Sequence, residues 1–262
     1  MKLRQIVGLA AGLGFSALAA AACAAPEPCA SVPAETTPIS AARLYIEYNA
    51  AAEDLGVHGG FDDHGWSELC IYAPDGALVL HVKPQAQLGD LTMAGIFFES
   101  REPALAEFTF EDLTAAFPEG QYTVRGINFD GTGLVGAANF THTVPSEPVI
   151  SAPPLAVEEE QVGDVVVNPA DLVIEWEPVT TAVGGGPLVI TGYEVIVTRL
   201  EQTDPHGYSL PVYDVHVPPD RTRLPVPVEF LEPGTAYELE VLALEESGNQ
   251  TIASGYFTTA AP

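Results

Sequence analysis

The feature that most constrains the fold is a turn rich in proline and glycine that leads directly into an alternating strand. Residues 231–237 read LEPGTAY, and apolar residues then follow at every second position, at Leu239, Val241 and Ala243. Alternation of this period predicts a half-buried β-strand. A tyrosine just past such a turn is typical of a tyrosine corner, in which the hydroxyl bonds to upstream backbone at the edge of a β-sandwich. The stretch therefore predicts an antiparallel sandwich in the C-terminal half.

Two aromatic strands precede this turn. Trp176 closes the apolar run LVIEW, and Tyr193 lies in the run ITGYEV. A tryptophan strand, a Gly-Tyr strand and an L-x-P-G-T-x-Y corner, in this order, resemble a fibronectin type III domain over residues 155–262. The resemblance implies structural roles in the core or at the corner for Trp176, Tyr193, Leu231, Pro233 and Tyr237. It also implies a binding, adhesion or spacer role outside the cytoplasm, although the fold alone specifies no activity.

The N-terminal half carries the same kind of pattern. Apolar and polar residues alternate from Leu44 to Tyr48, and the dipeptides at 75–76 and 130–131 are both Asp-Gly between apolar runs, which predicts hairpins. Thr109, followed by two acidic residues, predicts the N-cap of a short helix that ends before Phe117. Short strands at even spacing favour a sandwich. The approach PEGQY broadly resembles bacterial immunoglobulin-like sandwiches.

The fold class that follows is all-β, with two antiparallel β-sandwich domains in tandem. The expected order is a signal peptide (1–24), a flexible tether (25–40), an immunoglobulin-like sandwich (41–145), a proline-rich linker (146–154) and a fibronectin type III domain (155–262).

The first residues predict export. Lys2 and Arg4 precede an apolar run and an alanine-rich segment, as in a bacterial secretory signal peptide. The run is too short and too rich in Ala and Gly for a membrane span. Cys23 opens the alternative of a lipid anchor, but the position three residues earlier is Ala20 rather than a large aliphatic residue. A secreted or periplasmic chain is expected, with attachment to the cell surface left open.

Cleavage of the signal would leave two cysteines, Cys29 and Cys70, in an oxidising compartment. A bridge between them would fix the tail to the first domain and stabilise it by about 2–4 kcal/mol. Two unpaired cysteines, one on a tail and one in a strand, are the alternative.

The net charge of the chain argues against some classes of partner. The chain has 36 acidic and 9 basic residues, a formal net charge of −27. Such a surface repels nucleic acid and anionic lipid headgroups, because phosphate binding requires clustered Lys and Arg. It suits solubility, divalent cations or a basic partner. The expected partner is a protein or glycan outside the cytoplasm.

The best candidate site is residues 54–66, DLGVHGGFDDHGW, which are expected to form a Gly/Asp/His loop. Its acidic side chains, with two residues of the neighbouring strand, form a calcium-like set of oxygen donors: Glu47, Asn49, Asp54, Asp62 and Asp63. Its imidazoles, His58 and His64, could instead form a zinc or copper site. The spacing matches no recognised metal motif, and a solvated acidic loop is the alternative.

Catalytic motifs are absent from the sequence. There is no G-x-S-x-G elbow, and the glycines at 184–186 lie between predicted strands rather than before a helix. The sequence therefore predicts a non-enzymatic protein without a cofactor. Two alternatives are a divalent-metal-binding protein or small metal-dependent hydrolase that uses residues 54–66, and an accessory carbohydrate-binding module.

Overall fold

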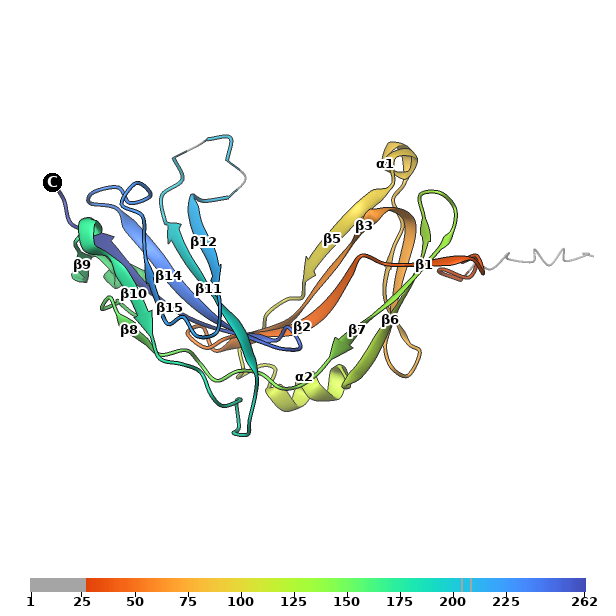
Figure 1. The fold of residues 1–262 in the computed structure, drawn as a ribbon, viewed down its shortest axis with the longest axis horizontal. Helices are drawn as coiled ribbons and strands as arrows, with labels where there is room; N and C mark the ends of the chain where they lie inside the picture. Colours follow the sequence, from red (N-terminus) through yellow and green to blue (C-terminus); the bar gives the residue numbers. More distant parts are fainter. Residues whose placement is uncertain (1–26, 204, 208) are drawn as a thin grey trace, which may run out of the picture.

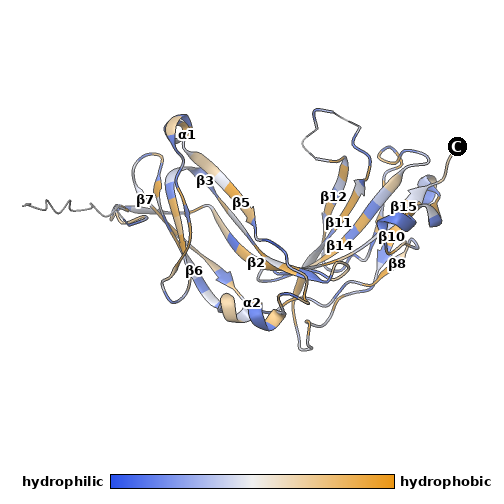
Figure 2. Cartoon of the chain, turned by 180° about the vertical axis from the view of Figure 1, so that it is seen from behind, coloured by the Kyte–Doolittle hydropathy of each residue, from blue (hydrophilic) through white to orange (hydrophobic). Residues whose placement is uncertain are grey.

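A computed structural model of the chain describes residues 27–203, 205–207 and 209–262. The expected signal peptide and Cys23 lie outside these residues. The prediction of an all-β fold is confirmed: two arms built of strands diverge from a common base (Figure 1). Along the strands, hydrophobic and hydrophilic residues alternate (Figure 2). Within the described residues, no helix is both long and apolar enough to cross a membrane.

The elements divide between the two arms. The N-terminal arm contains β1 (Thr36–Pro38), β2 (Ala41–Asn49), β3 (Asp54–Tyr72), β4 (Leu78–Val82), α1 (Ala86–Leu91), β5 (Met93–Glu99), α2 (Phe110–Ala116), β6 (Gly120–Asn128) and β7 (Gly133–Phe140). The C-terminal arm contains β8 (Ile150–Ala152), η1 (Glu159–Asp164), β9 (Val166–Val167), η2 (Pro169–Asp171), β10 (Val173–Trp176), β11 (Ile190–Arg199), β12 (Val212–Val217), β13 (Arg223–Pro225), β14 (Ala236–Glu245) and β15 (Gln250–Thr259).

In the C-terminal arm two separate sheets enclose the core. One has the order β12-β11-β14-β15 and the other β13-β10-β8. Trp176 and Tyr193 meet edge to face, with ring centroids 5.4 Å apart, and Tyr237 stacks on Phe257 at the same distance. The Tyr237 hydroxyl accepts a hydrogen bond of 2.7 Å from the backbone N–H of Glu232. This is the contact that defines a tyrosine corner.

In the N-terminal arm one strand serves both layers. The first part of β3 pairs with β2 on one side and β5 on the other, whereas the part after Trp66 pairs with β4 and β6. The register shifts between Asp62 and Trp66, where the strand bends from one layer to the other. Phe61, Trp66 and Tyr122 are fully buried in the core that the bend encloses.

Residues 54–66 are therefore strand, and the prediction of a loop is wrong. The glycines that suggested a loop instead let side chains of the neighbouring segment cross the strand. A Cβ at Gly59 would lie 2.3 Å from the Phe98 ring, and a Cβ at Gly56 would lie 2.8 Å from Cγ of Glu102. Glycine inside a strand marks such close approaches as well as turns.

The expected tether (25–40) packs on the first domain over its described part. The Sγ atoms of Cys29 and Cys70 are 2.13 Å apart in a disulfide, and Cys29 is 3% exposed. Strand β1 pairs in parallel with β7. The segment lacks alternation and is rich in proline, so its pattern gave no sign of a strand.

The expected linker (146–154) also contains structure, because β8 pairs antiparallel with β10. Its prolines flank a three-residue edge strand, a place where proline is tolerated. The short helix predicted after Thr109 is confirmed as α2, in which Thr109 and Asp112 form a capping box.

The two arms join through main chain and a buried side chain. Strand β15 pairs in parallel with the end of β2, with Gln250 opposite Glu47, so the two halves share a 12-stranded sheet. Asn249 is 1% exposed; its Oδ1 accepts from the N–H of Ile46 at 2.7 Å. Its Nδ2 donates to the carbonyls of Thr141 and Thr143 at 3.0 and 2.9 Å. The junction is thus hydrogen-bonded like a domain interior.

Candidate functional site

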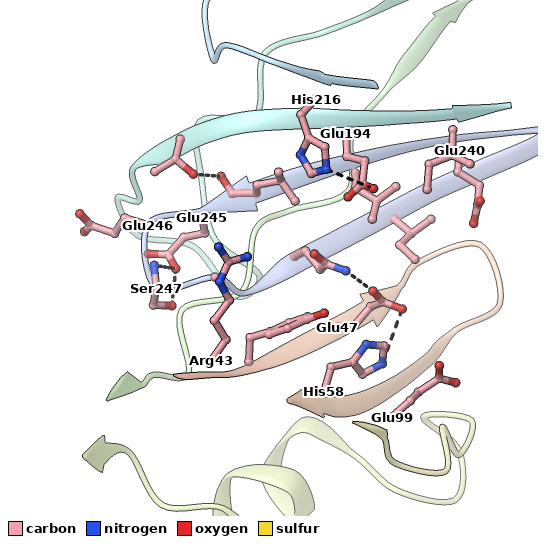
Figure 3. Close-up of a pocket in the computed structure, with 18 of the residues that line it drawn as sticks. Arg43, Glu47, His58, Glu99, Glu194, His216, Glu240, Glu245, Glu246 and Ser247 are labelled. Atoms are coloured by element: carbon pink, nitrogen blue, oxygen red, sulfur yellow. Dashed lines mark hydrogen bonds and ion pairs between the residues drawn. The ribbon is translucent and has the colours of Figure 1, made fainter. Parts of the chain in front are cut away.

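A cleft of about 710 Å³ lies between the arms, above the junction. Its N-terminal wall comes from β2, β3 and β5, and its C-terminal wall from β11, β12, β14 and β15 (Figure 3). Because each wall is one face of a sheet, side chains at alternate positions of each strand point into the same space.

The cleft is strongly acidic. Six glutamates line it, against three groups that can carry positive charge, Arg43, His58 and His216; the glutamates are Glu47, Glu99, Glu194, Glu240, Glu245 and Glu246. Burial, followed by the carboxylates of Glu238 and Glu47, raises the pKa of Glu240 to about 7. Burial also raises the pKa of Glu47 and of Glu194. Carboxylates of the two arms therefore influence one another across the cleft.

One group of potential ligands combines two residues of the N-terminal wall, Glu47 and His58, with the adjoining Glu102. His58 Nε2 lies 2.8 Å from Oε1 of Glu102 and 3.7 Å from Oε1 of Glu47. Potential ligand atoms of the three side chains all lie within 4.8 Å of one another. The His58 side chain is only 4% exposed, with the Tyr45 ring 5.4 Å and the Phe97 ring 5.8 Å away between centroids. Gln250 donates to the second carboxylate oxygen of Glu47 (Figure 3).

A second group combines Glu194 and His216 of the C-terminal wall with the adjoining Asp214. Glu194 on β11 is directly opposite His216 on β12, with Nε2 and Oε1 3.4 Å apart, and Asp214 is two residues from His216 on the same face. These three side chains also have ligand atoms within 4.8 Å of one another. The side chain of His216 is 65% exposed, so this group is far more solvated than the first.

The structure brings together only part of the predicted set of metal ligands, which combines residues 54–66 with Glu47 and Asn49 of the neighbouring strand. Glu47 and His58 meet in the cleft. Asn49 instead accepts from the N–H groups of Ala51 and Ala52 in the turn after β2. Asp54 lies near Glu102; its pKa is raised by burial and, to a smaller extent, by that carboxylate.

The remaining predicted ligands are dispersed by the alternation of β3. Asp63 points inward and accepts from the backbone N–H and the hydroxyl of Ser40 at 2.9 and 3.4 Å, whereas Asp62 and His64 are exposed. A strand sends neighbouring side chains to opposite faces, which a loop would not require.

Sequence reasoning missed Glu102, Glu194, Asp214 and His216. For the first two, the contact with an imidazole is made only in the folded chain, by the segment after β5 for Glu102 and by the pairing of β11 with β12 for Glu194. Asp214 and His216 did carry a local signal, because residues two apart in a strand share a face.

Comparisons with known proteins do not show which family the chain belongs to. No family model matches the chain, and no curated protein matches it. Among the solved structures that match is a tetra-tandem repeat from the extending region of a large adhesion protein, 13% identical with a TM-score of 0.26, over 84% of this chain and 50% of that one. Another comes from work on the host cell surface retention of a 1.5-MDa bacterial ice-binding adhesin. It is 15% identical, with a TM-score of 0.27, over 87% of this chain and 66% of that one. The chain thus spans less than two thirds of each, and its function has to be sought in its own residues.

Proposed function

We propose that this chain works outside the cytoplasm as a non-catalytic β-sandwich protein with a binding, adhesion or spacer role, in which two domains are held at a fixed angle. The observation that carries the proposal is the junction. Ladder pairing between β2 and β15 and the bonds of buried Asn249 tie the arms together at several points. A flexible linker would let the arms rotate, whereas this junction transmits orientation and force from one arm to the other.

Two features support a location outside the cytoplasm. The first residues have the composition of a secretory signal. The Cys29–Cys70 disulfide is a bond that persists in oxidising compartments.

The partition of strands supports a fibronectin type III assignment for the C-terminal arm. Three strands, β8, β10 and β13, face the sheet of β11, β12, β14 and β15, and Tyr237 bonds to the chain at a corner five residues upstream. Such sandwiches serve as scaffolds that present loops and faces to partners.

The proposal is tested by expressing the whole chain with a C-terminal tag in a bacterium and fractionating the cells. We expect the tagged chain outside the cytoplasm, digested by protease added to intact cells or released by osmotic shock, with Cys29 and Cys70 protected from thiol alkylation until a reductant is added. A cytoplasmic chain in which Cys29 and Cys70 react with the alkylating reagent without a reductant would contradict the proposal. A variant with Lys2 and Arg4 replaced by Asp serves as the control that should fail to be exported.

A further inference from the structure

We propose that Glu47 and His58, which line the N-terminal wall of the cleft, and the adjoining Glu102 form a binding site for a divalent first-row transition-metal ion of the zinc class. The three side chains come from β2, from β3 and from the segment after β5, so the site exists only in the folded arm. Nitrogen from imidazole and oxygen from carboxylate are ligands that Zn²⁺ accepts, at about 2.0–2.2 Å.

The geometry suits a single ion. An ion that binds at about 2.1 Å to each ligand needs ligand atoms about 3–4 Å apart. His58 Nε2 is 2.8 Å from Glu102 and 3.7 Å from Glu47. Only small side-chain adjustments separate this arrangement from coordination, with the direct contact between His58 and Glu102 opening as the ion enters.

The surrounding residues hold the ligands in place. Tyr45 and Phe97 flank the imidazole, and Gln250 donates to the oxygen of Glu47 that does not face His58. A hydrogen bond of this kind orients a ligating carboxylate. Because Gln250 belongs to the C-terminal arm and lies opposite Glu47 in the pairing of β15 with β2, an ion bound by Glu47 would be linked directly to the junction.

Gly56 leaves room for the Glu102 side chain to reach His58. A Cβ at this position would lie 2.8 Å from Cγ and 3.0 Å from Oε1 of Glu102. The glycine thus leaves the space over β3 in which the Glu102 side chain reaches toward His58. This use of a strand glycine is independent of the charges of the cluster.

The electrostatics favour a cation with more than one charge. Among the described residues, no lysine or arginine forms an ion pair with Glu47 or Glu102; their ion-pair partner is His58. Two carboxylates beside one largely buried imidazole leave negative charge uncompensated. A divalent ion would supply that compensation, and the imidazole favours a transition metal over Ca²⁺, which prefers an all-oxygen shell.

The group on the opposite wall provides an internal comparison. Glu194, Asp214 and His216 offer the same kinds of ligand atom, but the His216 side chain is 65% exposed compared with 4% for His58. Solvated side chains must give up more freedom and hydration to hold an ion. The buried group is therefore the tighter site.

The test uses the chain purified without a histidine tag and stripped with EDTA. Zn²⁺ is titrated by calorimetry, and Co²⁺ is added separately to read the coordination from its visible spectrum. We expect one tight site, with Ca²⁺ at equal concentration producing no comparable heat. His58→Gln and Glu102→Gln should each weaken zinc binding at least about tenfold, as should Gly56→Ala, which leaves all ligands present.

Two matched controls are His64→Gln, an exposed imidazole on the same strand, and His216→Gln; both should retain the tight site. Unchanged circular dichroism of each metal-free variant shows that lost binding is not lost folding. Zinc affinity that is unaffected by His58→Gln, or that is lost with His216→Gln or His64→Gln, would overturn the assignment. So would a chain that binds Ca²⁺ but not Zn²⁺, or neither ion. None of these results bears on export, so the proposed function stands or falls separately.

Discussion

The C-terminal arm places its core between two separate sheets, whereas in the N-terminal arm β3 bends and belongs to both layers. Despite this difference, each arm has a buried tyrosine whose hydroxyl bonds a few residues upstream. Tyr237 accepts from the N–H of Glu232 at 2.7 Å, and Tyr122 donates to the carbonyl of Pro118 at 3.2 Å. The tyrosine corner is therefore present in both arms, although the two arms close their layers in different ways.

A further difference is that the N-terminal arm alone carries a disulfide. The bridge joins residues 41 positions apart and ties the N-terminal segment to β3. Replacing Cys29 and Cys70 by Ser is expected to lower the free energy of unfolding by about 2–4 kcal/mol, because the unfolded chain regains the freedom of a closed loop. Urea denaturation measures the loss.

Hydrogen exchange should show the larger loss of protection in β3 and β6 and a smaller loss in β10 and β13. Uniform loss of protection in both arms would show that the arms do not differ in the way described. The wild-type chain after reduction and alkylation is the matched control.

The junction joins the two arms and is tested at Asn249. Asn249→Ala removes the acceptor for Ile46 and the donor for two threonine carbonyls in a site that is 1% exposed. Leaving these groups unpaired should cost about 2–3 kcal/mol. Calorimetry should then resolve two unfolding transitions in place of one. Exposed Asn139→Ala is the control, and equal behaviour of the two variants would contradict the role of the junction.

The acidic cleft should make stability depend on pH. The pKa of Glu240 is raised from 4.5 to about 7, first by burial and then by neighbouring carboxylates. The native state thus holds a proton that the unfolded state releases, and the free energy of unfolding falls as the pH rises from about 4.5 to 7.

Glu240→Gln cannot ionise and should reduce this fall by about 1–2 kcal/mol. Urea denaturation at pH 5 and pH 8 measures the difference, with exposed Glu229→Gln as the control. A fall that persists unchanged in Glu240→Gln would show that other groups cause it.

The smallest expected loss of stability is that of removing a tyrosine hydroxyl at either of the two corners. Tyr237→Phe leaves the N–H of Glu232 without its partner and should cost about 1 kcal/mol. Tyr122→Phe loses a longer bond to a carbonyl and should cost less. Thermal melts show which of the two variants loses more stability. A larger loss in Tyr122→Phe than in Tyr237→Phe would contradict this prediction.

The sequence predicts the C-terminal core well because each signal there is local. Alternation around Tyr237 and the turn before it are visible within one segment, and Trp176 and Tyr193 lie in similar apolar runs. The sequence leaves the pairing of the two cysteines as one of two alternatives, and the structure joins them.

The cleft could not be predicted in the same way. From the sequence, Gly56 and Gly59 indicate a loop. In the structure they are glycines because the Glu102 and Phe98 side chains approach β3 closely at these positions, and that approach depends on the fold of the segment around β5. Glu102 lies 44 residues from His58, and no local pattern reports that they meet. The parallel pairing of β15 with β2 is likewise a contact between the two halves of the chain.

Whether the arms keep one orientation can be measured as a distance between them. Spin labels introduced as unnatural amino acids at Asp90 on α1 and at Asp220 after β12, both exposed, report the distance between the arms by pulsed electron paramagnetic resonance. We expect one narrow distance distribution that broadens in Asn249→Ala. A broad distribution in the labelled chain that retains Asn249 would show that the arms move independently.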